Sequence, residues 1–153
     1  MAYEVAVQLE KPQLIAAVRV RVTIAEVGRA WRPALDQVWT VLRADGTLKP
    51  GHNLFLYHHP ARRDLPMDID FGVVVARRFD QAGDVRCVET PFGEVATTRH
   101  IGPYERLRGA HDAIHAWCAA NARAIGEASW ETYGDWNADE TKLETTVSYL
   151  LAD

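Results

Sequence analysis

The sequence is short of the features that mark several classes of protein. It has two cysteines, Cys87 and Cys118, whose spacing fits neither a disulfide framework nor a Cys-x-x-Cys metal pair. No apolar run approaches the roughly 18 residues that a membrane-spanning helix requires. The first residues include Glu4 and lack the apolar core of a signal peptide. We therefore expect a soluble, cytoplasmic protein with reduced thiols and no membrane partner.

An excess of positive charge is also absent. The 153 residues carry 17 basic and 21 acidic side chains, which gives a net charge of −4, and the only lysines are Lys11, Lys49 and Lys142. Nucleic-acid-binding domains usually carry a basic patch or stripe, so we expect no nucleic-acid partner. With 48% hydrophobic and 25% charged residues, the composition is typical of one globular domain, here residues 1–153. A chain of this length needs no disulfide or metal for stability.

Sequence motifs of common cofactor and metal sites are missing as well. There is no Gly-rich dinucleotide fingerprint, phosphate loop or Ser-His-Asp arrangement. His111 and His115 have the i, i+4 spacing that can bind zinc, but no glutamate lies between them and no third ligand is evident. The tandem His58-His59 is more typical of a solvated loop. We therefore expect no cofactor and no metal.

The two halves of the chain show the same order of predicted elements. Alternating apolar and polar residues predict strands, and apolar residues three or four apart predict helices. The first half has predicted strands at 4–8 and 14–22, a helix at about 27–45, and strands at 53–58 and 68–77. The second half has predicted strands at 84–89 and 94–100, a helix at about 103–124, and strands at 129–133 and 143–150. Each half is therefore predicted to be a β-β-α-β-β unit.

Local signals mark where these elements begin and turn. Thr23 and Glu26 form a predicted capping box at the start of the first helix. Pro33, inside that helix, is expected to kink or split it. Glu10–Pro12 and Thr90–Gly93 are predicted to be the turns between the first two strands of each unit.

A tandem duplication explains the repeated order. The repeats cover about residues 3–79 and 83–151, and Tyr57 and Tyr133 occupy matching positions 76 residues apart. We expect an α+β fold in which the two units form antiparallel sheets with both helices on one side, related by a pseudo-twofold. A cleft on that pseudo-twofold is the expected ligand site. Because the repeats use nearly all of these residues, we expect no helix-turn-helix among them.

One junction carries a resemblance to a known family. The sequence Arg99-His100-Ile101-Gly102-Pro103-Tyr104 resembles the R-H-x-G-P-Y strand-to-helix junction of the GyrI-like small-molecule-binding family. These are the effector-binding domains of AraC- and MerR-type regulators, which also occur as stand-alone proteins. The strand 130–133, the loop 135–141 and the strand start 143–145 agree with the resemblance, whereas the first repeat has residues 20–23 in place of the junction. A glycine followed by a proline also suits a sharp turn into a helix, so an architectural role explains the motif equally.

Glu131 is the main candidate for contact with a ligand. Its strand places Ser129, Glu131 and Tyr133 on one face. A carboxylate among aromatic rings is costly unless it is exposed or paired with a cation, and a solvated or salt-bridged acid is the alternative interpretation. The resemblance implies that Glu131 matches the cation-binding glutamate of the family. Rings around such a carboxylate would provide stacking and cation–π contacts.

Aromatic residues supply the other candidates. Tyr57 and Tyr133 are expected to lie on opposite walls of the cleft, and Phe55 matches Glu131 in the first repeat. Further candidates for ligand contacts are Trp31, Trp39, Tyr104 and Trp117. The alternative for the three helix tryptophans is a core position between helix and sheet. Trp136, in a polar loop, is interpreted either as a lid or as a surface anchor.

The resemblance implies a stand-alone binding protein for hydrophobic, often cationic or planar small molecules. A second interpretation is a hydrolase of cyclopropane-bearing DNA-alkylating toxins, with Glu131 as general base and Tyr133 or Tyr57 bonded to the substrate. A raised pKa of Glu131 beside the rings would suit that reaction. A third interpretation is a gyrase-inhibitor-like interaction module. The sequence leaves open whether the chain is an enzyme and whether it acts through a partner protein.

Overall fold

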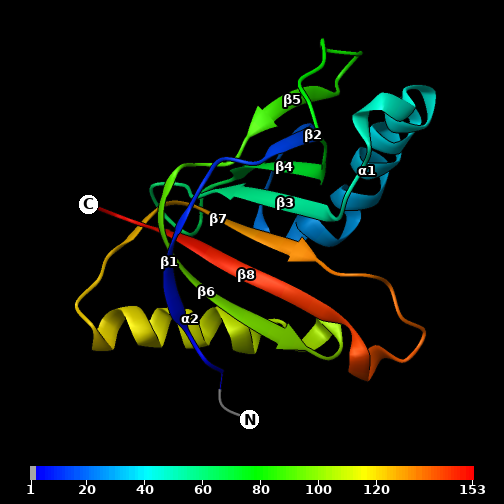
Figure 1. The fold of residues 1–153 in the computed structure, drawn as a ribbon. Coiled ribbons are helices and arrows are strands. Elements are labelled where there is room, and N and C mark those ends of the chain that lie inside the picture. Colours follow the sequence, from blue (N-terminus) through cyan, green and yellow to red (C-terminus); the bar gives the residue numbers. More distant parts are fainter. Residues whose placement is uncertain (1–2) are drawn as a thin grey trace.

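The computed structural model describes residues 3–153, in which eight strands and two α-helices follow the duplicated order (Figure 1). The first half contains β1 (Ala6–Glu10), β2 (Leu14–Val22), α1 (Val27–Ala44), β3 (Asn53–His58) and β4 (Met67–Val74). The second half contains β5 (Arg86–Glu89), β6 (Gly93–Ile101), α2 (Arg108–Ala120), β7 (Ile125–Tyr133) and β8 (Glu144–Leu151). The α+β fold and the β-β-α-β-β order of each half are confirmed.

All eight strands form one antiparallel sheet with both helices on the same face. The strand order is β1-β6-β8-β7-β3-β4-β2-β5, so β7 and β3 join the two halves in the middle. Phe71, Phe55, Glu131 and Val147 are successive register partners across four strands, and they therefore share a face. Phe71 belongs to the core cluster under α1 and Val147 to the cluster under α2. The middle of this face, between the helices, carries Glu131.

The first strand of each repeat pairs with the other repeat. β1 pairs with β6 at one edge of the sheet, and β5 pairs with β2 at the other edge. The connections at 11–13 and 90–92 thus link strands that do not pair with each other. A tight hairpin requires Gly, Asn or Asp at its central positions, and neither connection contains one of these residues. The exchanged strands tie the two repeats into one unit.

The face of the sheet without helices is also buried. Its core cluster consists of Ile15, Ala17, Leu54, Leu56, Val95, Ala128 and Trp130. Ile15 on β2 and Val95 on β6 both belong to it, although five strand spacings separate their strands. That separation would be ~24 Å in a flat sheet. In addition, only the three residues 11–13 connect β1 to β2, which lie six strand spacings apart in the sheet. Such a short connection requires a strongly curved sheet. Ile15, Leu54 and Val95 are 0% exposed although no helix lies on this face, so the curved sheet covers part of its own concave face.

The predicted capping box is present at the start of α1. Oε1 of Glu26 accepts hydrogen bonds from the backbone N–H of Thr23 (2.9 Å) and from its hydroxyl (2.8 Å). This contact caps a short 3₁₀ turn, Ile24–Glu26, that leads into α1. Pro33 lies inside α1, which continues through it to Ala44, so the proline does not split the helix.

The second strand-to-helix junction is longer than predicted. Gly102 has a φ of +138°, which favours glycine, and its N–H donates to the carbonyl of Leu143 (2.8 Å). A 3₁₀ turn, Tyr104–Arg106, follows it, and α2 begins only at Arg108. The predicted helix start at 103 is therefore too early, because the chain first crosses from the sheet to the helix layer.

Three further findings concern cysteines, membranes and metals. Cys118 is buried, Cys87 is half-buried, and both are free thiols. No helix within residues 3–153 combines the length and the apolar composition needed to cross a membrane. Within the same residues, no group of three or more His, Cys, Asp or Glu side chains is arranged to hold a metal ion.

Replacing Trp130 with alanine tests whether the helix-free face is a true core. Trp130 is 2% exposed, and removal of so large a buried side chain typically costs about 3–5 kcal/mol of unfolding free energy. We expect urea unfolding of Trp130→Ala to show a loss in this range. Leu9→Ala, at a position 63% exposed on β1, should change the same quantity by less than about 0.5 kcal/mol. A similar, small change for both variants would contradict the buried face.

Candidate ligand-binding site

The pairing of β3 with β7 places Glu131 at the centre of the molecule. Phe55 is the register partner of Glu131, and the two are matching positions of the repeats, 76 residues apart. The pseudo-twofold therefore passes between them, with a phenyl ring on one side and a carboxylate on the other. Glu131 is only 6% exposed, so the interpretation of a solvated acid does not hold.

Both carboxylate oxygens of Glu131 accept hydrogen bonds. Oε1 accepts from the hydroxyls of Tyr57 (2.6 Å) and Tyr133 (2.5 Å). Oε2 accepts from Nε2 of His111 (2.7 Å), on α2. We call Glu131, Tyr57, Tyr133 and His111 the Glu131 cluster. The duplication thus brings one tyrosine from each repeat to the same carboxylate oxygen.

These bonds keep Glu131 ionised. Burial raises the pKa of its carboxyl group, but hydrogen bonds from His111, Tyr133 and Tyr57 outweigh burial, so the pKa lies below its ordinary value. This corrects the expectation of a raised pKa, which considered burial beside the rings without the donors. Burial, together with the nearby carboxylate, holds the pKa values of Tyr57 and Tyr133 well above the ordinary value. Both phenols therefore stay protonated and act as donors.

One side of the cluster is aromatic. The ring centre of Phe55 lies 4.9 Å from that of Tyr133 and 6.3 Å from that of Trp31. Tyr104 packs edge-on against Tyr133 at 5.7 Å. We call Trp31, Phe55, Tyr133 and Tyr104 the aromatic wall. Tyr104 is its most accessible member, 42% exposed. The Gly-Pro junction therefore has the architectural role considered for it, because it makes the turn that brings Tyr104 against Tyr133.

The other side carries histidines around the ring of Tyr149. Its centre lies 5.7, 5.6 and 5.1 Å from the ring centres of His59, His111 and His115. Burial lowers the pKa values of His59 and His115, and it raises the pKa of Tyr149 to about 12. The sequence interpretation missed this side because it considered His111 and His115 only as zinc ligands. Their i, i+4 spacing was the available signal, since it puts both on one face of α2.

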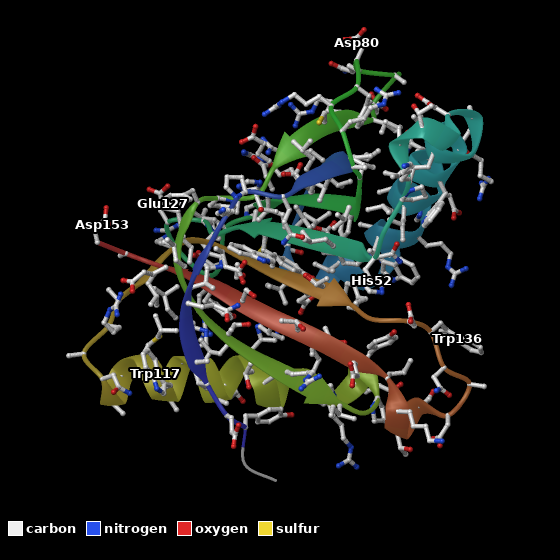
Figure 2. All side chains as sticks on the ribbon, in the orientation of Figure 1. His52, Asp80, Trp117, Glu127, Trp136 and Asp153 are labelled. Atoms are coloured by element: carbon white, nitrogen blue, oxygen red, sulfur yellow. The ribbon has the colours of Figure 1, made fainter. Side chains whose placement is uncertain are left out.

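Three of the tryptophans lie apart from Glu131. Trp39 is half-buried against the core under α1, and Trp117 is half-buried against the core under α2, as their core alternative describes. Trp136 is 78% exposed in the loop after β7, on the outside of the molecule (Figure 2). The predicted ligand contacts that the fold groups around Glu131 are Trp31, Phe55, Tyr57, Tyr104 and Tyr133.

A second buried acid shows what a structural carboxylate looks like in this fold. Asp70 is 0% exposed on the face without helices. Its two oxygens accept a bidentate pair of bonds from Arg19, both 2.9 Å, and one oxygen also lies 2.7 Å from Nε2 of His58. Guanidinium is a permanent cation that matches the carboxylate geometry. Within the described residues 3–153, Glu131 has no guanidinium partner; its partners there are two neutral phenols and an imidazole.

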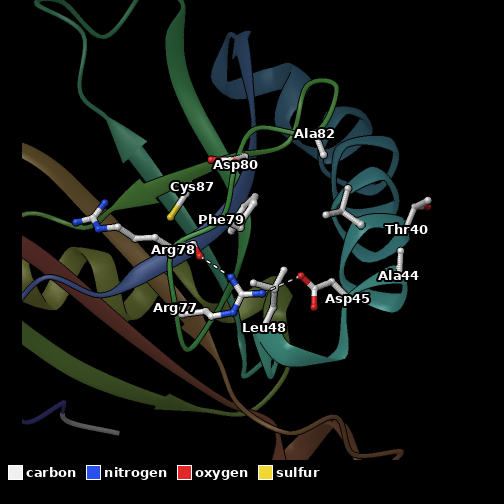
Figure 3. Close-up of a pocket in the computed structure, with 11 residues that line it drawn as sticks. Thr40, Ala44, Asp45, Leu48, Arg77, Arg78, Phe79, Asp80, Ala82 and Cys87 are labelled. Atoms are coloured by element: carbon white, nitrogen blue, oxygen red, sulfur yellow. Dashed lines mark hydrogen bonds and ion pairs between the residues drawn. The ribbon is translucent and has the colours of Figure 1, made fainter.

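Two hollows lie apart from the Glu131 cluster. One, of about 930 Å³, lies between the end of α1 and the segment before β5 (Figure 3). Phe79 and Cys87 line it, and Arg77 is bonded to Asp45 at its edge (3.0 Å). The other, of about 800 Å³, lies beside His100. Neither hollow is lined by a residue of the Glu131 cluster. Because Glu131 is only 6% exposed and both of its oxygens are hydrogen-bonded, a ligand can reach the carboxylate only if neighbouring side chains move.

The sequence carries a family signature over almost its whole length. Residues 3–150 match the family model of the GyrI-like small molecule binding domain. The chain belongs to this family. A comparison with curated proteins finds no match.

Solved structures share the fold of this GyrI-like domain. The C-terminal domain of EcmrR has a TM-score of 0.82 and 21% identity, over 100% of this chain and 99% of that one. In the EcmrR–DNA complex, this chain covers 59% of the longer EcmrR chain. SAV2435 bound to tetraphenylphosphonium has a TM-score of 0.71 and 13% identity, over 99% and 94%. A hydrolase from Listeria innocua has a TM-score of 0.69 and 9% identity, over 99% of this chain and 93% of that one. At these identities the likeness shows the fold.

Thr145 allows a test of the packing beside the site. It is fully buried opposite Tyr133 in the β7–β8 register, and its hydroxyl has no hydrogen-bond partner within residues 3–153. An unpaired buried hydroxyl costs about 1–3 kcal/mol. We therefore expect Thr145→Val to leave the free energy of unfolding unchanged or to raise it. The matched control is Thr98→Val on β6. The hydroxyl of Thr98 donates to the carbonyl of Glu4 (2.7 Å), so its removal should lower the free energy of unfolding by about 1 kcal/mol. Equal losses for both variants would show that Thr145 is hydrogen-bonded.

The lowered pKa of Glu131 predicts a pH dependence of stability. A carboxyl group whose pKa falls on folding stabilises the protein above its unfolded pKa, and this contribution is lost as the pH falls through the folded pKa. Wild type should therefore lose unfolding free energy relative to Glu131→Gln as the pH falls from about 6 to about 3. Urea unfolding at several pH values measures the difference. A wild type that gains stability relative to the variant on acidification would contradict the assigned direction.

Proposed function

We propose that this GyrI-like domain binds small aromatic cations at the Glu131 cluster. The observation that carries the proposal is a buried, ionised carboxylate whose partners among residues 3–153 are two phenols and one imidazole. Such a carboxylate retains attraction for a cation, because no guanidinium or ammonium group in this part of the chain neutralises it. The tetraphenylphosphonium bound to SAV2435, a relative with the same fold, supports this class of ligand.

The proposed roles of the residues follow from their positions. Glu131 supplies the charge, and the hydroxyls of Tyr57 and Tyr133 hold the carboxylate in place. Phe55, Trp31 and Tyr104 offer ring faces and edges to a planar or phenyl-bearing ligand. Ring pairs contribute about 0.5–1.5 kcal/mol each beyond the area they bury, and a cation over a ring adds a similar amount. We assign no ligand contact to Trp39 and Trp117, because among residues 3–153 no ring contact joins either of them to the aromatic wall.

Binding is favoured over hydrolysis by the state of the carboxylate. A general base works best with a pKa near the working pH, whereas the three donors hold the pKa of Glu131 below its ordinary value. The hydrolase alternative keeps some support from the fold of the Listeria innocua relative. Incubation with a cyclopropane-bearing alkylating toxin, followed by mass spectrometry, distinguishes the two. Ring-opened product from wild type, and none from Glu131→Gln, would show that the protein is a hydrolase that uses Glu131, and would contradict a function limited to binding.

Removal of the charge of Glu131 should weaken the binding of cationic ligands but not of neutral ones. Glu131→Gln keeps the shape of the side chain and removes its charge, so the affinity for tetraphenylphosphonium should fall by about 1.5–3 kcal/mol. That is roughly a tenfold to hundredfold rise in Kd. The affinity for uncharged triphenylphosphine oxide should change by less than about threefold. Intrinsic tryptophan fluorescence or calorimetry measures both ligands.

Glu127→Gln is the matched control for this experiment. Glu127 lies on the same strand, β7, and is exposed, so its replacement should leave both affinities unchanged. Equal losses for the cation and the neutral ligand in Glu131→Gln would show that Glu131 acts through structure. An equal loss of cation affinity in Glu127→Gln would show that only the overall charge matters. Either result would contradict the proposed site.

A further inference from the structure

We propose that His111 is the counter-charge of Glu131 in the ligand-free protein, and that it gives up a proton when an aromatic cation binds. Binding of an aromatic cation would then be coupled to the release of the proton from His111. This inference rests on the proposed function, and it concerns a residue on α2 that the sequence interpretation considered only for metal binding.

The hydrogen bonds of His111 permit both protonation states without any heavy atom moving; only the hydroxyl hydrogen of Tyr149 turns. Its Nε2 lies 2.7 Å from the carboxylate of Glu131, and its Nδ1 lies 2.7 Å from the hydroxyl of Tyr149. An ionised carboxylate can only accept, so Nε2 carries a proton in either state. A hydroxyl can donate or accept. Tyr149 therefore donates to Nδ1 of a neutral ring and accepts from Nδ1 of a protonated ring.

The charge around Glu131 explains why a proton is taken up and released. A buried carboxylate without a cation is strongly unfavourable, and among residues 3–153 His111 is the only basic side chain within ion-pair distance of Glu131. A protonated His111 completes a neutral pair. Once a ligand cation reaches the same carboxylate, two positive charges compete in a site of low dielectric constant. The proton is the charge that can leave.

Other titratable groups face His111, and their states favour it as the switching residue. On α2, His115 adjoins the same Tyr149 ring, and Asp112 is exposed and paired with Arg108 (3.8 Å). From the segment after β3, Arg63 lowers the pKa of His115, after the larger effect of burial, and burial lowers that of His59. The phenols of Tyr57, Tyr133 and Tyr149 have raised pKa values. The shifts of His59, His115 and the three phenols thus all favour the neutral forms of these groups.

Nδ1 of His59 donates to the carbonyl of Gly126 (3.2 Å), which leaves its Nε2 to accept from the hydroxyl of Ser129 (2.8 Å). The neutral ring of His59 therefore satisfies both hydrogen bonds. Of the three histidines around Tyr149, His111 is the one with a hydrogen bond to a carboxylate within residues 3–153, and its other nitrogen faces a hydroxyl that can donate or accept. Because the proposed exchange involves an imidazole, the binding experiments cover the range from pH 5 to 8.

Proton release on binding of tetraphenylphosphonium tests the inference directly. Calorimetric titrations at pH 6.0 in cacodylate and in Bis-Tris, which differ in ionisation enthalpy, give the number of protons released per ligand. We expect wild type to release roughly one half to one proton, and its Kd to fall by about fivefold to tenfold between pH 5.5 and 7.5. His111→Gln keeps an N–H donor for Glu131 but cannot be protonated, so it should release none and show a flat pH profile.

His52→Gln is the matched control, because His52 lies at the surface beside Asp135 (2.9 Å), apart from the cluster. It should release protons as wild type does. Binding by wild type with no proton release would overturn the role of His111 and leave the proposed function standing. Proton release that persists in His111→Gln would assign the exchange to another group. Failure of wild type to bind the cation at any pH would overturn both proposals. If His111→Gln does not fold, the histidine NMR signals of wild type, followed with and without ligand, show whether one ring loses its proton.

Discussion

A carboxylate buried without a permanent cation is the constraint on which this site depends. Burial of an ion costs several kcal/mol unless hydrogen bonds and charge replace the lost water. At Glu131, hydrogen bonds from one phenol on β3, one phenol on β7 and one imidazole on α2 offset this cost. The β3–β7 pairing that joins the two halves and the docking of α2 are both needed to bring these donors together. The partners are weaker than a guanidinium group, which is why we propose that the carboxylate is available to a ligand. Asp70, by contrast, is held by Arg19 on the opposite face.

Duplication followed by divergence accounts for the two unlike sides of the site. Trp31 on α1 and His111 on α2 are 80 residues apart, the same offset as Arg19 and Arg99 on the strands before the helices. The buried residues of the helices follow this offset too, with Ala34 and Val38 matching Ile114 and Cys118. One fold position thus became part of the aromatic wall in the first repeat and the partner of Glu131 in the second. In the proposed function, a symmetric scaffold with one acid on its axis would offer a ligand both stacking and charge.

Local patterns predicted the parts of this site that depend on one strand. Alternation put Glu131 and Tyr133 on one face, and the 76-residue repeat pointed to Tyr57. The remaining features depend on contacts between distant segments. The exchange of β1 and β5 between the repeats, the burial of Trp130 on the curved face and the approach of His111 to Glu131 all require the assembled sheet. The direction of the pKa shift of Glu131 could not be predicted from one strand either. The hydrogen-bond donors that lower this pKa come from β3, β7 and α2.

A crystal structure of the protein with tetraphenylphosphonium tests the central claim most directly. The account predicts the phosphonium centre beside Glu131, phenyl rings against Phe55 and Tyr133, and a displacement of side chains that now close the cluster. The hollow lined by Phe79 and Cys87 should remain empty. A ligand seated in that hollow, with Glu131 still bonded to Tyr57, Tyr133 and His111, would contradict the account.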